Sequence, residues 1–149
     1  MSYNSILEAI KTNSEINPGK LCVGDKKNKA TYGQFWKMIN KGAAYLEKNG
    51  VKKGDVVVLR GAQKVEYLFS IFSIQLLGAI ACPLEKAVKE DRILEIMNFV
   101  ETKYFLDTKK LKDTSAECIS LKEMFKEAMN DETECDVNKY ELPKSDDLS

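Results

Sequence analysis

Residues 53–59, Lys-Gly-Asp-Val-Val-Val-Leu, decide the fold predicted for this chain. Lys53-Gly54-Asp55 has the composition of a tight turn, and residues 56–59 form a short, continuous apolar run rich in valine. A strand that is apolar on both faces is typical of a parallel sheet covered by helices on both sides. The run therefore predicts a central parallel strand over residues 56–59.

Helix-like and strand-like segments alternate after that strand. Residues 64–77 are apolar almost all round, which predicts a buried helix ended by Gly78. Residues 79–82 predict a short strand, and Pro83 is expected to end its pairing because proline lacks an amide hydrogen.

The same alternation continues further along the chain. The apolar residues of 93–100 share one helical face, and residues 103–106 follow as a strand. Ser120 and Glu123 have the spacing of a capping box ahead of another amphipathic helix.

On the amino side of the central strand, the sequence predicts a hairpin and a helix. Residues 21–23 and 30–32 flank a polar turn, which indicates two antiparallel strands. Thr31 and Gln34 have capping-box spacing at the start of a helix, and Asn49-Gly50 ends that helix as a left-handed cap would.

Together these segments predict an α/β fold: three layers, with a mostly parallel sheet and helices on both faces, preceded by a β-hairpin. Residues 1–129 are expected to form this α/β unit. Residues 130–149 contain seven acidic residues and few large apolar ones, so we expect a solvated acidic linker there.

Composition excludes several classes of function. The chain of 149 residues has no histidine, which rules out Ser–His–Asp catalysis, Cys–His catalysis and His-ligated zinc within it. The four cysteines form no C-x-x-C pair, so neither a metal site nor a dithiol redox site is expected. Basic and acidic residues balance at 23 each, which disfavours nucleic-acid binding.

The sequence also predicts where the protein resides. The first fifteen residues lack the pattern of a signal peptide, and the longest apolar stretch is too interrupted to span a membrane. Cysteines in apolar runs are typical of a reducing compartment, so we expect a cytoplasmic protein, although four cysteines could in principle pair.

Candidate binding residues are few, and no catalytic residue is assigned. Ligands of open α/β sheets bind beyond the carboxyl ends of the strands. The loop at residues 60–64 matches neither G-x-G-x-x-G nor G-x-x-x-x-G-K-[ST], so a plain turn is the favoured interpretation. Lys109, Lys110 and Lys112 follow the strand at 103–106 and could hold a phosphate or pyrophosphate, although such a run is more often a solvated face.

Four ordered motifs resemble the start of the AMP-forming adenylate synthetases. They are Thr31-Tyr32, N-K-G-A-A-Y-L at 40–46, G-V-K-K-G-D-V-V-V-L at 50–59, and L-G-A-I-A-C-P-L at 77–84. That superfamily includes acyl-CoA synthetases, peptide-synthetase adenylation domains and luciferases. The resemblance covers about half of the chain and implies scaffold roles for the residues that carry it.

The resemblance implies an amino-terminal subdomain of a larger ligase. The full enzyme would use Mg²⁺ and ATP to convert a carboxylic acid to acyl-AMP and pyrophosphate, and would then pass the acyl group to a thiol such as CoA. In the family the ATP-binding loop follows a segment like residues 146–149, so this chain alone is expected to bind no cofactor and to be inactive.

Two narrower expectations follow from the resemblance. Pro83-Leu84-Glu85-Lys86 looks most like the acyl-CoA synthetases of fatty acid metabolism, and Lys109, Lys110 and Lys112 would then be candidates for the CoA phosphates. The expected partner is the rest of the same polypeptide. Without that partner, the helix at 65–76 would expose apolar surface to solvent, which predicts self-association. The alternative is a stand-alone α/β module that binds a partner or nucleotide without catalysis.

Overall fold

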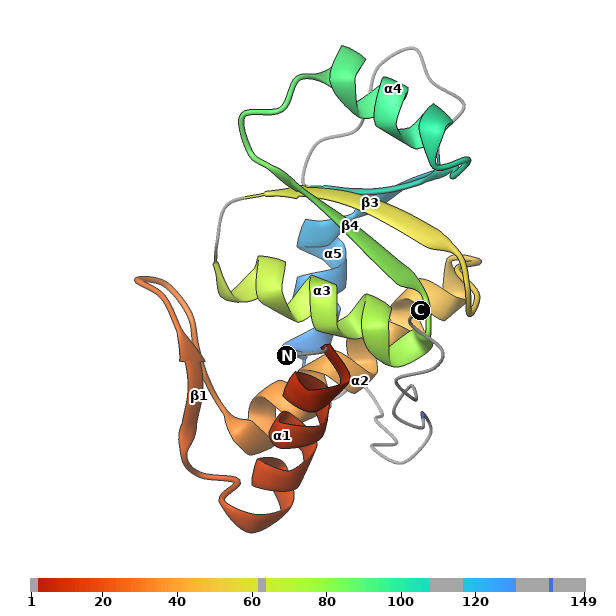
Figure 1. The fold of residues 1–149 in the computed structure, drawn as a ribbon. Coiled ribbons are helices and arrows are strands. Elements are labelled where there is room, and N and C mark those ends of the chain that lie inside the picture. Colours follow the sequence, from red (N-terminus) through yellow and green to blue (C-terminus); the bar gives the residue numbers. More distant parts are fainter. Residues whose placement is uncertain (1–2, 62–63, 108–116, 131–139, 141–149) are drawn as a thin grey trace.

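The computed structural model describes residues 3–61, 64–107, 117–130 and 140. Its centre is a four-stranded sheet with the strand order β4-β3-β5-β6, in which every pair of neighbours is parallel (Figure 1). The strands are β3 (Val56–Gly61), β4 (Ile80–Glu85), β5 (Tyr104–Asp107) and β6 (Glu117–Ser120).

The central position predicted for residues 56–59 is confirmed. Val58 in β3 lies opposite Cys82 in β4 on one side and Phe105 in β5 on the other. Successive strand residues point to opposite faces. Val57 and Val58 are therefore both fully buried, each under a different helix layer.

Helices cover both faces of the sheet, as the alternation predicted. α2 (Tyr32–Lys48), α3 (Val65–Leu77) and α5 (Leu121–Ala128) lie on one face, and α4 (Glu90–Phe99) lies alone on the other (Figure 1). α1 (Tyr3–Ile16) packs outside this arrangement against α2.

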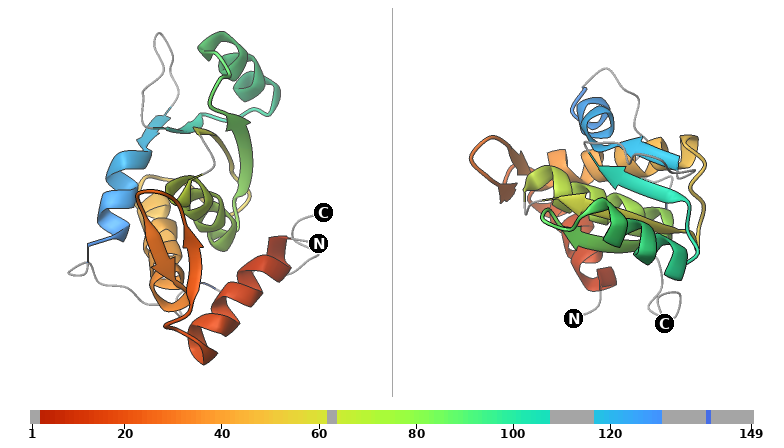
Figure 2. Two further views of the ribbon diagram at one scale, coloured as in Figure 1. Left: turned by 90° about the vertical axis from the view of Figure 1, so that its left-hand side faces the viewer. Right: turned by 90° about the horizontal axis from the view of Figure 1, so that it is seen from above.

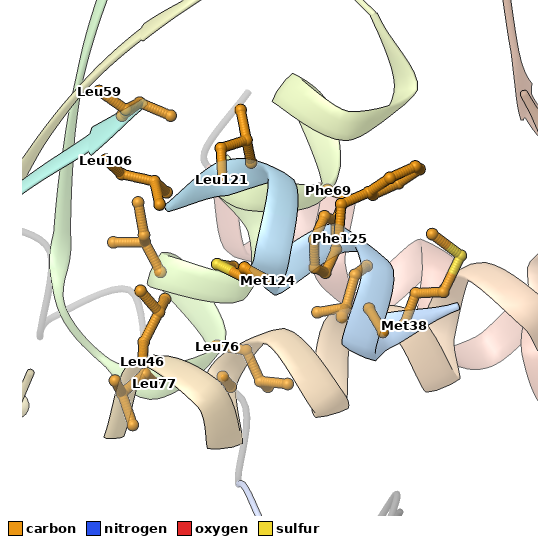
Figure 3. Packing of buried hydrophobic residues seen from close by; sticks show 14 of the residues in the cluster. Met38, Leu46, Leu59, Phe69, Leu76, Leu77, Leu106, Leu121, Met124 and Phe125 are labelled. Carbon is orange, nitrogen blue, oxygen red and sulfur yellow. The ribbon is translucent and has the colours of Figure 1, made fainter. Parts of the chain in front are cut away.

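The larger core lies between the sheet and the three helices on its first face. Figure 3 shows Leu121, Met124 and Phe125 of α5 among side chains from the sheet and from α2 and α3. Phe125 and Phe69 pack with their ring centroids 5.6 Å apart. The smaller core, under α4, contains Val58, Ile93, Met97 and Phe105.

The predicted hairpin and helix caps are also present. β1 (Leu21–Gly24) and β2 (Lys29–Thr31) pair antiparallel and project to one side of the layers (Figure 2). At the start of α2, Thr31 Oγ1 accepts from the Gln34 amide at 3.2 Å, and Gln34 Oε1 accepts from the Thr31 amide at 3.0 Å. Gly50 ends the helix with a φ of 96°. Ser120 Oγ accepts from the Glu123 amide at 3.2 Å, one half of the other predicted box.

The expectation that Pro83 ends the strand is wrong, because β4 continues through Pro83 to Glu85. β4 is an edge strand, and the Ile80 amide donates to the Asp55 carbonyl of the chain leading into β3. Amides alternate sides along a strand, so position 83 faces the open edge, where a missing donor breaks no ladder bond.

The expectation that α3 supplies exposed apolar surface is also wrong. α3 is enclosed by α2, α5 and the sheet. Leu68, which is 36% exposed, is the only large apolar side chain of α3 that counts as exposed. Exposed apolar side chains of the described part of the chain lie instead on other elements; they include Ile16, Leu21, Ile80 and Phe99.

Candidate functional site

The carboxyl ends of β3, β4 and β5 meet at one edge of the sheet, because the three strands are parallel. At this edge Gly61 of β3 lies opposite Glu85 of β4. Ligands of open α/β sheets bind at such an edge. We therefore take it as the candidate functional site.

An ion pair joins the ends of the two central strands. Arg60 of β3 places its Nε 3.0 Å and its Nη2 2.9 Å from Asp107 Oδ2 of β5. The two side chains are only 14% and 10% exposed. Arg60 Nη1 also donates to the Val88 carbonyl at 2.6 Å, which ties the loop before α4 to the sheet.

The Arg60 guanidinium is therefore already bound by other groups of this chain. All three of its nitrogen atoms have protein partners, and its central carbon lies 5.9 Å from the Phe105 ring centroid. A planar guanidinium would suit a phosphate. Here it holds three segments of the chain together.

Tyr67 covers the end of β3 from the side of α3. A Cβ at Gly61 would lie 3.1 Å from the Tyr67 ring, so glycine allows this close approach. The Tyr67 hydroxyl donates to the Leu84 carbonyl at 3.2 Å, and burial raises the pKa of that hydroxyl. The phenol therefore remains protonated near neutral pH and acts as a donor, not as a base.

The start of α3 is where a phosphate loop would present its amides. In this chain the Asp25 carboxylate of the hairpin turn occupies that place and accepts from the Val65 amide at 2.9 Å. Asp25 also accepts from the Lys27 amide at 2.7 Å and the Asn28 amide at 2.8 Å. These bonds, led by the one from Val65, lower the pKa of Asp25. A negative charge already sits at the helix start, where it would repel a phosphate.

The other groups considered for a cofactor or metal ion are lysines, metal-ligating side chains and thiols. The three candidate lysines, Lys109, Lys110 and Lys112, lie outside the described residues, so their prediction stays untested. Within the described ranges, no three His, Cys, Asp or Glu side chains group to hold a metal ion. Burial raises the pKa of the Cys22 and Cys82 thiols, which keeps both protonated. The described residues therefore do not fit Mg²⁺ or ATP.

A hollow of about 640 Å³ lies at the opposite edge of the sheet. Its lining includes Lys52 and Lys103 together with Asp55 and Glu101, so its charges balance. The Asp55 carboxylate accepts from the Lys52 amide at 2.8 Å, which closes the turn before β3. This hollow has no excess charge with which to select an ionic ligand.

Sequence reasoning missed the two features that define the carboxyl edge. The Arg60–Asp107 pair had a signal, because each charged residue directly follows an apolar run that was predicted to be a strand of the same parallel sheet. The hydrogen bond from the Val65 amide to Asp25 had no such signal, since it joins residues 40 positions apart in segments of different type.

No helix in the described part of the chain is long and apolar enough to cross a membrane.

Comparisons with known proteins give a consistent result. The family model for the AMP-binding enzyme matches residues 10–149. A nonribosomal peptide synthetase, tcpP, from Claviceps purpurea is 30% identical over 105 residues, which cover 70% of this chain and 5% of the relative. The D-alanine--D-alanyl carrier protein ligase of Bacillus licheniformis is 24% identical over 102 residues, which cover 68% of this chain and 20% of the relative.

The fold is similar to that of solved adenylation enzymes. The N-terminal subdomain of Klebsiella oxytoca NpsA, in complex with 3-hydroxybenzoyl-AMSN, superposes with a TM-score of 0.81 at 18% identity. The match covers 98% of this chain and 36% of that structure. The chain thus spans about a third of the solved protein and a fifth or less of the two curated relatives.

Proposed function

The chain belongs to the AMP-binding enzyme family, and we propose that it forms the amino-terminal part of an adenylate-forming acid–thiol ligase. The observation that carries this proposal is the family match over residues 10–149. The whole protein would activate a carboxylic acid as acyl-AMP with release of pyrophosphate, and would transfer the acyl group to a thiol.

Within that protein we assign the described residues a scaffold role. Two groups that could bind a phosphate, the Arg60 guanidinium and the amide at the start of α3, are both occupied by carboxylates of this chain. We infer that the nucleotide and its metal ion are held by residues outside those described. The division expected from the sequence is an α/β unit over 1–129 followed by an acidic linker over 130–149.

The acceptor thiol is the finer part of the proposal. Pro83-Leu84-Glu85-Lys86 favours CoA and a fatty acid substrate, with Lys109, Lys110 and Lys112 as candidates for the CoA phosphates. A second candidate acceptor is a carrier-protein thiol. The relatives include a D-alanine--D-alanyl carrier protein ligase, whose name states that acceptor, and this favours the second candidate.

Pyrophosphate exchange into ATP tests the proposed activity in the longer polypeptide that contains this chain. We expect exchange that depends on one class of carboxylic acid, tested with a panel of fatty, aryl and amino acids. Exchange with none of these acids would support the stand-alone binding module instead.

Thioester formation from the activated acid then distinguishes the two acceptors. Transfer to free CoA supports the acyl-CoA proposal, and transfer only to a carrier protein supports the second candidate. Replacing Lys109, Lys110 and Lys112 with alanine should raise the KM for CoA and leave pyrophosphate exchange unchanged. An unchanged KM for CoA would remove these lysines from the site.

A further inference from the structure

Two described residues beyond α5, Asn130 and Tyr140, both contact α2. Lys41 Nζ donates to the Asn130 carbonyl oxygen at 2.8 Å. The Tyr140 hydroxyl donates to Glu47 Oε1 at 3.2 Å. The chain therefore returns to the same helix at two points of contact.

The position of Tyr140 does not follow from chain length alone. Tyr140 lies ten positions after Asn130 in the sequence, and an extended chain of that length can span about 33–36 Å. Lys41 and Glu47 are six residues apart, or about 9 Å along the helix axis. Tyr140 thus lies beside α2 although the chain could reach much farther, so a specific attraction must hold it there.

Packing supplies that attraction. The Tyr140 side chain is partly buried and packs against the larger hydrophobic core. A tyrosine ring has a large apolar area, and its hydroxyl finds a partner at the edge of the core. The Glu47 carboxylate accepts this bond at an exposed site, where a charged acceptor strengthens it.

We propose that Tyr140 is a positioning residue that docks on α2 and fixes where the chain leaves the α/β unit. Tyr140 itself then belongs to the folded unit, although it lies eleven residues past the boundary expected at 129. Any chain that continues from Tyr140 would start from this contact beside α2. This last consequence rests on the proposed function, whereas the docking of Tyr140 does not.

Limited digestion of the 149-residue chain with trypsin tests the proposal at the Lys139–Tyr140 peptide bond. Cleavage there requires the docked residue to leave α2, so its rate reports the undocked population. In Tyr140→Ser we expect cleavage about 10-fold faster than in the wild-type chain. The same substitution in a synthetic peptide of residues 131–149 corrects for its effect on the protease itself.

Further variants separate the ring from the hydroxyl. Tyr140→Phe keeps the packing and should accelerate cleavage only about 2-fold to 3-fold, as should Glu47→Ala, which leaves the cleavage site intact. The control is Lys48→Ala, at the exposed residue next to Glu47, which should leave the rate unchanged. The melting temperature should stay within about 2 °C in every variant, since the contact is local.

Equal cleavage rates in the wild-type chain, Tyr140→Ser and Glu47→Ala would overturn the proposal. The same conclusion would follow if cleavage rose only in proportion to a fall in melting temperature, because Tyr140 would then act on global stability. Failure of pyrophosphate exchange in the longer polypeptide would count against the proposed function and leave this result untouched.

Discussion

Gly42 lies where α2 passes close to α3. A Cβ at this position would clash with Ser73 Oγ and would lie 2.5 Å from Cε2 of Phe69. Gly42→Ala should lower the free energy of unfolding by about 1–3 kcal/mol, because the packed helices must separate to admit the methyl group. Urea unfolding measures the change.

Gly19→Ala is the matched control for that substitution. Nothing lies within 4 Å of a Cβ at position 19. The free energy of unfolding should therefore change by less than about 0.5 kcal/mol. Equal effects of the two substitutions would contradict the close contact between α2 and α3.

Asp25 should make stability depend on acid pH. Its pKa is lowered from the usual 3.8 by bonds from the amides of Val65, Asn28 and Lys27. The folded structure thus stabilises the ionised carboxylate of Asp25 more than the unfolded chain does. The stabilisation is fully present above the unfolded pKa and is lost as the pH falls through the folded pKa.

The variant Asp25→Asn tests this dependence, because it removes the charge. Its deficit in the free energy of unfolding relative to wild type should be largest near about pH 6 and should shrink toward about pH 3. Denaturant unfolding across this range measures it. A deficit that is constant with pH would show that the charge of Asp25 does not matter.

At the scale of the elements, the Arg60–Asp107 pair joins β3, β5 and the loop before α4. Asp107→Ala should cost about 3–5 kcal/mol of unfolding free energy, because it leaves a largely buried guanidinium without its carboxylate. Arg92→Ala is the control, since Arg92 and Glu95 form an ion pair that is 66% exposed at both side chains. That change should cost about 0–1 kcal/mol in the same urea titration. Similar costs for both would show that the pair does not hold the carboxyl edge together.

The elements themselves were largely predictable from the sequence. The run at 56–59 and the apolar helix after it have local patterns that burial reinforces, and both are as predicted. The end of β4 was not, because proline stops a strand only where its amide would face a neighbour, and strand order is a property of the whole sheet. β6 was not predicted either. It is four residues long and contains Glu117 and Ser120, so it lacks the apolar run by which the other strands of the sheet were predicted.

At the scale of the whole molecule, self-association remains a prediction, with exposed apolar side chains other than those of α3 as its source. Phe99 at the end of α4 is 87% exposed, and Ile80 at the start of β4 is 50% exposed. We expect Phe99, as the most exposed of these side chains, to contribute to association of the 149-residue chain, because water is released from exposed apolar side chains on contact. Sedimentation velocity should show a concentration-dependent increase in mass that Phe99→Ser weakens. Asn98→Ser, at the exposed neighbouring position, should not change it. A monomer at all concentrations would contradict the prediction.

The candidate site was less predictable than the fold. Topology indicated only where to look, because the carboxyl ends of parallel strands lie at the same edge of the sheet. What occupies that edge depends on side chains from distant segments, such as Asp25 reaching the start of α3. Neither spacing nor periodicity records such contacts, and the lysines chosen from the sequence fall outside the described residues.

Titration of the 149-residue chain with Mg-ATP by calorimetry tests the central claim most directly. The claim is that these residues are a scaffold whose phosphate-binding groups are occupied by Asp25 and Asp107. We expect no saturable heat at micromolar or low millimolar ATP, because exposed lysines contribute at most about 1 kcal/mol each. Saturable binding with a micromolar Kd would contradict the account and would show that this part of the protein carries a nucleotide site of its own.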